Sequence, residues 1–202
     1  MTGTDKSAPD LLPKHEFVAG RLCLDFCNTL SRGAGAGPRD RIASAADFSA
    51  WAKRLGWDSV PPPGPEALHG LRDFRAALLA IVDATVENTV QAPQNLQVLA
   101  GEIAALRRSE RLVSTANGRI LLAENAENPV EKLRHAIARD AADLLLGPDR
   151  ERIKRCPGHD CRWVFFDASK NLSRRWCAME DCGARDKVRR FRRRKSAAPA
   201  AN

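Results

Sequence analysis

The sequence of 202 residues contains no tyrosine, and aromatic residues make up 5% of it. No apolar run approaches the ~20 residues of a membrane span. The first 14 residues are polar and include proline, unlike a signal peptide. No Walker loop, dinucleotide-binding fingerprint or Ser/His/Asp set is found. We therefore expect a cytoplasmic protein that is not an enzyme and does not contact a membrane.

Most of the chain has no net positive charge, and the excess of basic residues lies at its end. Residues 151–202 hold 15 basic and 6 acidic residues, a net charge of +9, whereas residues 1–150 have a net charge of −1. A neutral body with a basic end is typical of a protein that binds a polyanion. The alternative is a solvated basic tail that only improves solubility.

The first 150 residues contain enough apolar residues to form a core, and most of them recur at helical spacing. A short strand before Gly20 is predicted to pass into a helix that carries Leu24, Cys27 and Leu30. Further helices are predicted over residues 44–55, with Ser44 as the N-cap, and over residues 66–90, 93–108 and 129–146. Residues 111–115 and 119–123 instead lie on either side of Ala116-Asn117-Gly118. Asn-Gly accepts the positive φ values of a tight primed turn, so this segment predicts a hairpin.

These patterns predict an α+β fold with four segments. Residues 1–13 are expected to be disordered, and residues 14–148 to form a mainly helical domain with a short β-hairpin. A small zinc finger at 149–195 and a disordered tail at 196–202 complete the chain. Cys23 and Cys27 lie in an apolar stretch, so we interpret them as buried side chains of the helical domain.

Four other cysteines follow a symmetric pattern, Cys156-x4-Cys161 and Cys177-x4-Cys182. In a chain without an export signal, paired cysteines at short spacing are typical of a tetrahedral zinc site. Four thiolates leave no open coordination position, so one structural Zn²⁺ is expected. An iron–sulfur cluster, or His159 in place of one cysteine, are less favoured alternatives. No Cys-x-x-Cys is present, which argues against a redox pair.

The residues around the cysteines predict a treble-clef-like finger. Residues 163–166 and 174–176 are expected to pair as a hairpin. A helix from Cys182 to Lys195 should follow, with Ala184, Val188 and Phe191 on the face that packs against the hairpin. Trp163 and Trp176 are expected to pack inside the finger; stacking on nucleic-acid bases is the alternative.

Basic residues of this finger are the candidates for nucleic-acid contact, because guanidinium groups bind phosphates and guanine edges bidentately. The candidates are Arg174, Arg175, Arg185, Lys187, Arg189, Arg190, Arg192 and Arg193. DNA is the favoured partner. RNA or an acidic protein remains possible, since a basic helix beside a zinc site does not distinguish them.

The cysteine segment, with Phe165-x-Asp167-x-Ser169, Arg174-Arg175-Trp176 and Cys182-Gly183-Ala184-Arg185, resembles the CGNR zinc finger of bacterial transcription regulators. Ala184 stands where the family signature has asparagine. Residues 17–30, with Gly20 and Leu22-Cys23-Leu24-Asp25-Phe26, resemble the start of the ABATE domain that precedes such fingers. The resemblance implies a stress-induced transcription regulator with a DNA-binding finger.

Two polar residues, Asp25 and Asn28, stand in an otherwise apolar stretch and require partners if buried. They could hold a small-molecule effector, which would make the N-terminal domain a sensor. The alternative is that both hold the backbone of the core. A single finger reads a short site, so a homodimer is attractive, although the sequence shows no stripe that would form one.

Overall fold

The computed structural model describes residues 17–31, 39–126 and 128–197, and for Ser196 and Ala197 it describes the backbone only. The segment predicted to be disordered at 1–13, and most of the predicted tail, lie outside these residues. Among the described residues, no helix is long and apolar enough to cross a membrane.

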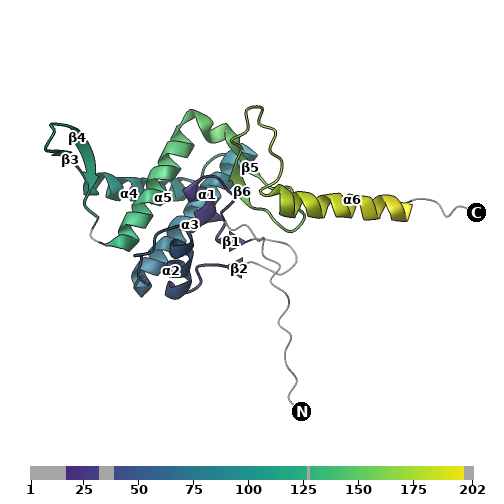
Figure 1. Ribbon diagram of the computed structural model, residues 1–202, viewed down its shortest axis with the longest axis horizontal. Coiled ribbons are helices and arrows are strands. Elements are labelled where there is room, and N and C mark those ends of the chain that lie inside the picture. The colour runs from purple at the N-terminus through teal and green to yellow at the C-terminus, as the bar shows by residue number, and fades with distance from the viewer. Residues whose placement is uncertain (1–16, 32–38, 127, 198–202) are drawn as a thin grey trace, which may run out of the picture.

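Five helices form the body of the molecule (Figure 1). They are α1 (Leu22–Cys27), α2 (Ala45–Arg54), α3 (Pro65–Glu87), α4 (Pro93–Ser109) and α5 (Pro129–Leu146). The short helix α1 contacts both α3 and α5. Its Phe26 ring lies 5.7 Å from the rings of Trp51 and Phe74, measured between centroids. The apolar residues of α1 thus lie in the core of the body.

The helix boundaries follow the predicted signals. Ser44 caps α2 in a capping box with Asp47, whose backbone N–H donates to the Ser44 hydroxyl. Proline occupies the first position of α3, α4 and α5, where its missing N–H costs nothing. The predicted helices over 44–55, 66–90, 93–108 and 129–146 are therefore confirmed to within a few residues.

Within the part of the chain that the structure describes, three two-stranded antiparallel sheets complete the fold. The first pairs β1 (Leu30–Ser31) with β2 (Arg39–Asp40), and the second pairs β3 (Glu110–Ser114) with β4 (Ile120–Glu124). Two local predictions are wrong. Residues 17–19, the described part of the predicted strand, form no strand. Leu30 lies in β1 and not in the helix, because α1 ends at Cys27.

The β3–β4 hairpin is confirmed, but its turn differs from the predicted one. Gly118 has a φ of +77°, whereas Asn117 does not have the positive φ that a type I′ turn requires at both central residues. The Gly118 N–H donates to the Thr115 carbonyl, and the Thr115 N–H donates to the Arg119 carbonyl. The loop is therefore longer than a two-residue turn.

The third sheet corrects the predicted topology of the finger. After a 3₁₀ turn at Pro148–Arg152 (η1), β5 (Ile153–Arg155) pairs with β6 (Val164–Phe166). Residues 174–176 form no strand. The first cysteine pair therefore lies within the turn of the hairpin, where the ladder on both sides fixes its ends.

Strand β6 contributes to two cores at once. Trp163 and Phe165 face the cysteine cluster, whereas Val164 packs into the core of the helical body and Phe166 against it. This is the period-two alternation of a strand. Trp163 and Trp176 are both buried, so the prediction that they pack inside the finger is confirmed.

Hydrogen bonds also join the finger to the body. The Asn28 side chain donates from Nδ2 to the Val164 carbonyl (2.8 Å) and accepts the Val164 N–H at Oδ1 (3.0 Å). The Phe166 N–H donates to the Ala19 carbonyl (2.7 Å). Because Asn28 and Val164 are both buried, this amide pairing fixes the position of β6 against the body.

The last helix, α6 (Ala184–Ala197), extends away from the rest of the molecule (Figure 1). A π-helical turn at Met179–Gly183 (η2) precedes it. The predicted packing of Ala184, Val188 and Phe191 against the hairpin is wrong, since Val188 is 50% exposed, Phe191 is 68% exposed and Ala184 is also exposed. The helix leaves the finger at Gly183 and does not fold back.

We predict that Asn28→Ala destabilises the protein by about 2 kcal/mol or more, because it leaves the N–H and the carbonyl of Val164 without their partner. Urea unfolding followed by circular dichroism would measure the loss. Gln97→Ala, at an exposed position of α4, is the control and should change little. Equal stability of Asn28→Ala and wild type would show that the amide pairing contributes nothing.

Candidate metal centre and basic helix

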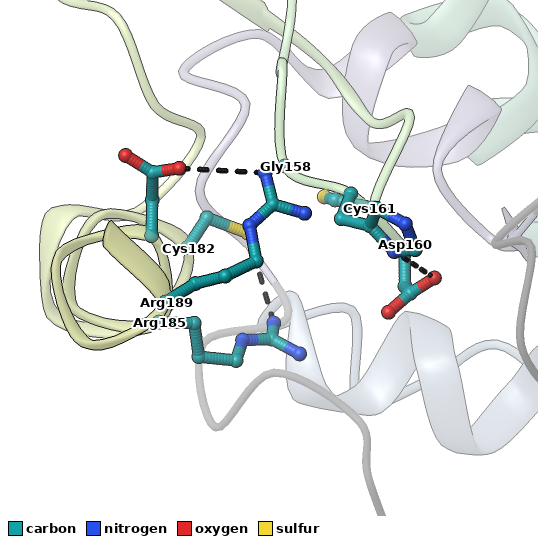
Figure 2. Close-up of a pocket in the computed structure, with 8 residues that line it drawn as sticks. Gly158, Asp160, Cys161, Cys182, Arg185 and Arg189 are labelled. Carbon is teal, nitrogen blue, oxygen red and sulfur yellow. Dashed lines mark hydrogen bonds and ion pairs between the residues drawn. The ribbon is translucent and has the colours of Figure 1, made fainter. Parts of the chain in front are cut away.

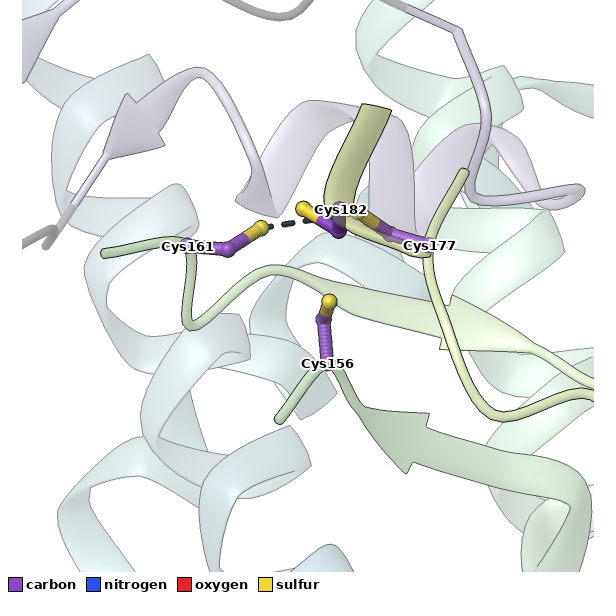
Figure 3. Close-up of side chains that lie close together, drawn as sticks. All are labelled: Cys156, Cys161, Cys177 and Cys182. Atoms are coloured by element: carbon purple, nitrogen blue, oxygen red, sulfur yellow. Dashed lines mark hydrogen bonds between the residues drawn. The ribbon is translucent and has the colours of Figure 1, made fainter. Parts of the chain in front are cut away.

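Four cysteine sulfurs converge on one point in the finger (Figure 3). Cys156 and Cys161 come from the turn of the β5–β6 hairpin; Cys177 lies just before the turn η2, and Cys182 lies within it. All four sulfurs lie within 4.8 Å of one another and are buried. The Cys161–Cys177 and Cys177–Cys182 separations are both 3.5 Å, far longer than a disulfide bond.

This geometry fits zinc. Sulfurs at about 2.3 Å from the centre of a tetrahedron are about 3.8 Å apart, close to the separations observed. His159 is exposed and pairs with Asp160, so it is not one of the ligands. The four cysteines thus form an all-thiolate site for one structural zinc ion, as predicted.

The four thiols interact strongly because their sulfurs lie close together. Hydrogen bonds from the neighbouring thiols lower the pKa of Cys156 far below its usual value. Zinc binds the deprotonated form of each cysteine, so all four side chains would be thiolates in the metal-bound protein.

Glycine is required in the first turn of the site. A Cβ atom at Gly158 would lie 3.0 Å from Cys161 Cβ, 3.2 Å from Cys182 Sγ and 3.5 Å from Cys156 Sγ. A larger residue would therefore crowd Cys161 and Cys182, whereas its distance from Cys156 is an ordinary contact.

Asp167 organises the loop that connects the two cysteine pairs. It is fully buried, and its carboxylate accepts from Lys154 Nζ (2.6 Å), the Ser169 N–H (2.9 Å) and the Arg174 N–H (3.0 Å). Burial alone would raise the pKa of Asp167. The hydrogen bonds from Lys154 and Ser169 outweigh it and hold the pKa well below its usual range.

Arg174 acts inside the protein, which departs from its expected contact with nucleic acid. Its Nε donates to the Trp176 carbonyl (3.1 Å) and its Nη1 to the Phe166 carbonyl (3.0 Å). Its Nη2 donates to the carbonyls of Val18 and Cys177. Four of its five N–H groups are thus used, so Arg174 joins the second cysteine pair to β6 and to the body.

The two candidate ligand-binding residues of the body also hold backbone groups. Asp25 accepts the Ala19 N–H at Oδ1 (3.0 Å), and Asn28 pairs with Val164. These contacts account for both polar side chains in the apolar stretch, as the structural alternative expects. Cys23 and Cys27 are buried in the core of the body, and burial raises the pKa of the Cys23 thiol.

The remaining basic candidates are exposed or partly exposed. Arg185 donates to Asp181 (2.7 Å) and to Cys182 Sγ (3.7 Å), which links it to the metal site. Arg189 and Arg190 pair with Asp186. Arg175 lies over the Trp176 ring, and the exposed residues Lys187, Arg192 and Arg193 follow along α6.

A pocket of about 200 Å³ lies between the first cysteine turn and α6 (Figure 2). Gly158, Asp160 and Cys161 line one side, and Cys182, Arg185 and Arg189 line the other. The arginines at the start of α6 thus lie beside the metal site.

Two family models match the chain. The ABATE family, described as "Putative stress-induced transcription regulator", matches residues 20–148, and the CGNR zinc finger matches residues 152–195. The chain belongs to the ABATE family. No match was found among curated proteins. The two models cover the helical body and the finger in the order that the sequence resemblance implied.

The sequence indicated the metal ligands and singled out Asn28 and Asp167, but it did not show which groups these side chains hold, and it gave no role to Lys154. Asn28 and its partner Val164 are 136 residues apart in the chain. The signal available was that Asp167, Ser169 and Arg174 belong to the CGNR-like pattern.

We predict that the purified protein binds one zinc ion per chain and that Cys177→Ser lowers this content severely, because a lost thiolate opens the site. Elemental analysis and thermal unfolding with a chelator would measure both effects. The matched control is Cys27→Ser, a buried cysteine outside the site, which should lower stability but retain zinc. Full zinc content in Cys177→Ser would contradict the ligand set.

A second prediction concerns pH. Because the pKa of Asp167 is depressed in the folded state, its stabilisation is present above the unfolded pKa of about 3.9 and is lost as pH falls further. Asp167→Asn should therefore lower the melting temperature by the same amount at all pH values between about 5 and 8. A destabilisation that disappears within this range would show that Asp167 titrates there.

Proposed function

We propose that this protein is a DNA-binding transcription regulator whose zinc finger presents α6 to duplex DNA. One observation carries the proposal. The metal ligand Cys182 lies in the turn η2 directly before helix α6, and the side chains of α6 from Lys187 to Lys195 are all exposed. The sequence of α6 contains eight basic residues and one acidic residue.

The dimensions of α6 suit the major groove of B-DNA. A helix of 14 residues is about 21 Å long, and the groove, about 12 Å wide, admits an α-helix. Basic residues on both sides of the helix would contact the two phosphate backbones. The proposed contact residues are Arg175, Arg185, Lys187, Arg189, Arg190, Arg192 and Arg193.

The apolar residues of α6 also favour a groove. Val188 and Phe191 are one turn apart on the same side of the helix and are exposed despite their apolar character. In a groove they would meet thymine methyl groups, which apolar side chains contact. An acidic protein surface or a phosphate chain offers no such partner.

We further propose that the body modulates the finger. Two groups of the body bind the finger directly. Asn28, the C-cap residue of α1, pairs with Val164, and the Val18 carbonyl accepts from Arg174. A ligand that shifts α1 would therefore move β6 and Arg174. Since reduced thiols hold the metal, this role suits the cytoplasm.

Binding of duplex DNA should weaken with salt by about 0.9 log units in affinity per log unit of salt for each phosphate contact. Replacing Arg189 and Arg190 with alanine should flatten this slope by about 2 and lower affinity roughly tenfold per residue at about 0.1 M salt. Fluorescence anisotropy with labelled duplex would measure both quantities.

The control is Lys53→Ala with Arg54→Ala, an exposed basic pair of α2 that removes the same charge from the body. If both double variants bind equally, α6 is not the contact surface. Tighter binding of single-stranded or structured RNA than of duplex DNA would overturn the choice of partner.

A further inference from the structure

The β3–β4 hairpin leaves the helical body at the end of the molecule opposite to α6 (Figure 1). Its base is held firmly. Glu110 and Glu124 both accept from Arg139 (2.8 and 3.3 Å), and Glu124 also lies 2.8 Å from His135 Nδ1. The strands beyond this base extend away from α5.

The outer part of the hairpin is apolar on both faces. On one face, Leu112, Ile120 and Leu122 are 73%, 72% and 55% exposed. On the other, Val113 and Leu121 are 38% and 45% exposed. The hairpin thus holds five of the twelve exposed large hydrophobic residues of the described chain, in two strands of five residues each.

Such a surface is costly to leave in water. An isolated two-stranded hairpin is marginally stable, and its outer edges carry unpaired backbone groups. The five side chains expose on the order of a few hundred Å² of apolar surface, the range in which patches on monomers are often functional. The helical body does not cover this surface, which makes it a candidate interface.

The charged residues of the hairpin indicate which kind of partner its apolar surface can bind. Among its strand residues, the face that carries Leu112, Ile120 and Leu122 has no basic side chain, because Arg111 lies on the opposite face. The acidic residues of that face, Glu110 and Glu124, are paired with Arg139 and His135 of the body. Without basic side chains this face offers no contact to phosphates, in contrast to the basic helix α6, so a nucleic acid is not the occupant. A second hairpin of the same sequence is equally apolar and equally neutral. Two copies joined here would also keep their basic finger ends apart.

We propose that this hairpin is a homodimer interface, in which two copies pack their hairpins around a two-fold axis. Two-fold dimers are the commonest oligomers, and their interfaces are self-complementary. The exposed hairpin supplies part of the ~800 Å² per subunit of a standard interface. We therefore expect a reversible dimer with a dissociation constant in the micromolar range.

Sedimentation velocity of the full, zinc-loaded chain from low to several hundred micromolar tests the proposal. High salt and nuclease treatment exclude bridging by nucleic acid, because phosphate contacts weaken with salt. The wild type should shift from monomer to dimer over this range. Ile120→Lys with Leu122→Lys should remain monomeric, with unchanged circular dichroism, because both residues are exposed.

The matched control is Val90→Lys with Leu146→Lys, which adds the same charge at two exposed aliphatic positions outside the hairpin. It should dimerise like the wild type. A wild type that stays monomeric, or a hairpin variant that dimerises equally well, overturns the proposal. The measurement involves no DNA, so its outcome is independent of the proposed function.

Discussion

The binding of four thiolates to one cation fixes the direction of α6. Cys182 lies in the turn that leads into this helix, Cys177 lies just before that turn, and Cys156 and Cys161 come from the β5–β6 hairpin. Four thiolates so close together repel one another, and a bound cation offsets this repulsion. The metal therefore determines whether the basic residues form one oriented surface.

The finger is built around this site by contacts of two kinds. Asp167 accepts hydrogen bonds from the Lys154 ammonium group and from backbone N–H groups of the loop. Arg174 donates to carbonyls from three separate segments. Both side chains use charge to hold backbone that forms no regular structure. This explains why so short a finger can hold a long, irregular connection between its ligand pairs.

The sequence was most informative where the signal is local. Helix starts depend on residues within one turn, such as Ser44 with Asp47, and the cysteine spacing depends on a single loop. The exposure of Val188 and Phe191 could not be predicted in this way. Their spacing indicates an apolar face, but whether that face is covered depends on the direction in which α6 leaves Gly183.

The pairing of β5 with β6 was missed for a related reason. Both 153–155 and 174–176 flank a cysteine pair, and the sequence offers no local rule to choose between them. The choice is made by Ile153 and Val164, which are buried in the core of the helical body. A long-range contact thus decides a short-range pairing, and periodicity within the finger does not contain that information.

The alternation of β6 between two cores limits how the chain can be cut or recombined. A fragment that begins near residue 150 would expose Ile153 and Val164, which are buried in the core of the body, to solvent. It would also lack Asn28, the hydrogen-bond partner of Val164. Fusing the finger alone to an unrelated protein would therefore favour aggregation. A transferable unit would have to include the finger together with α1, whose C-cap residue Asn28 binds β6.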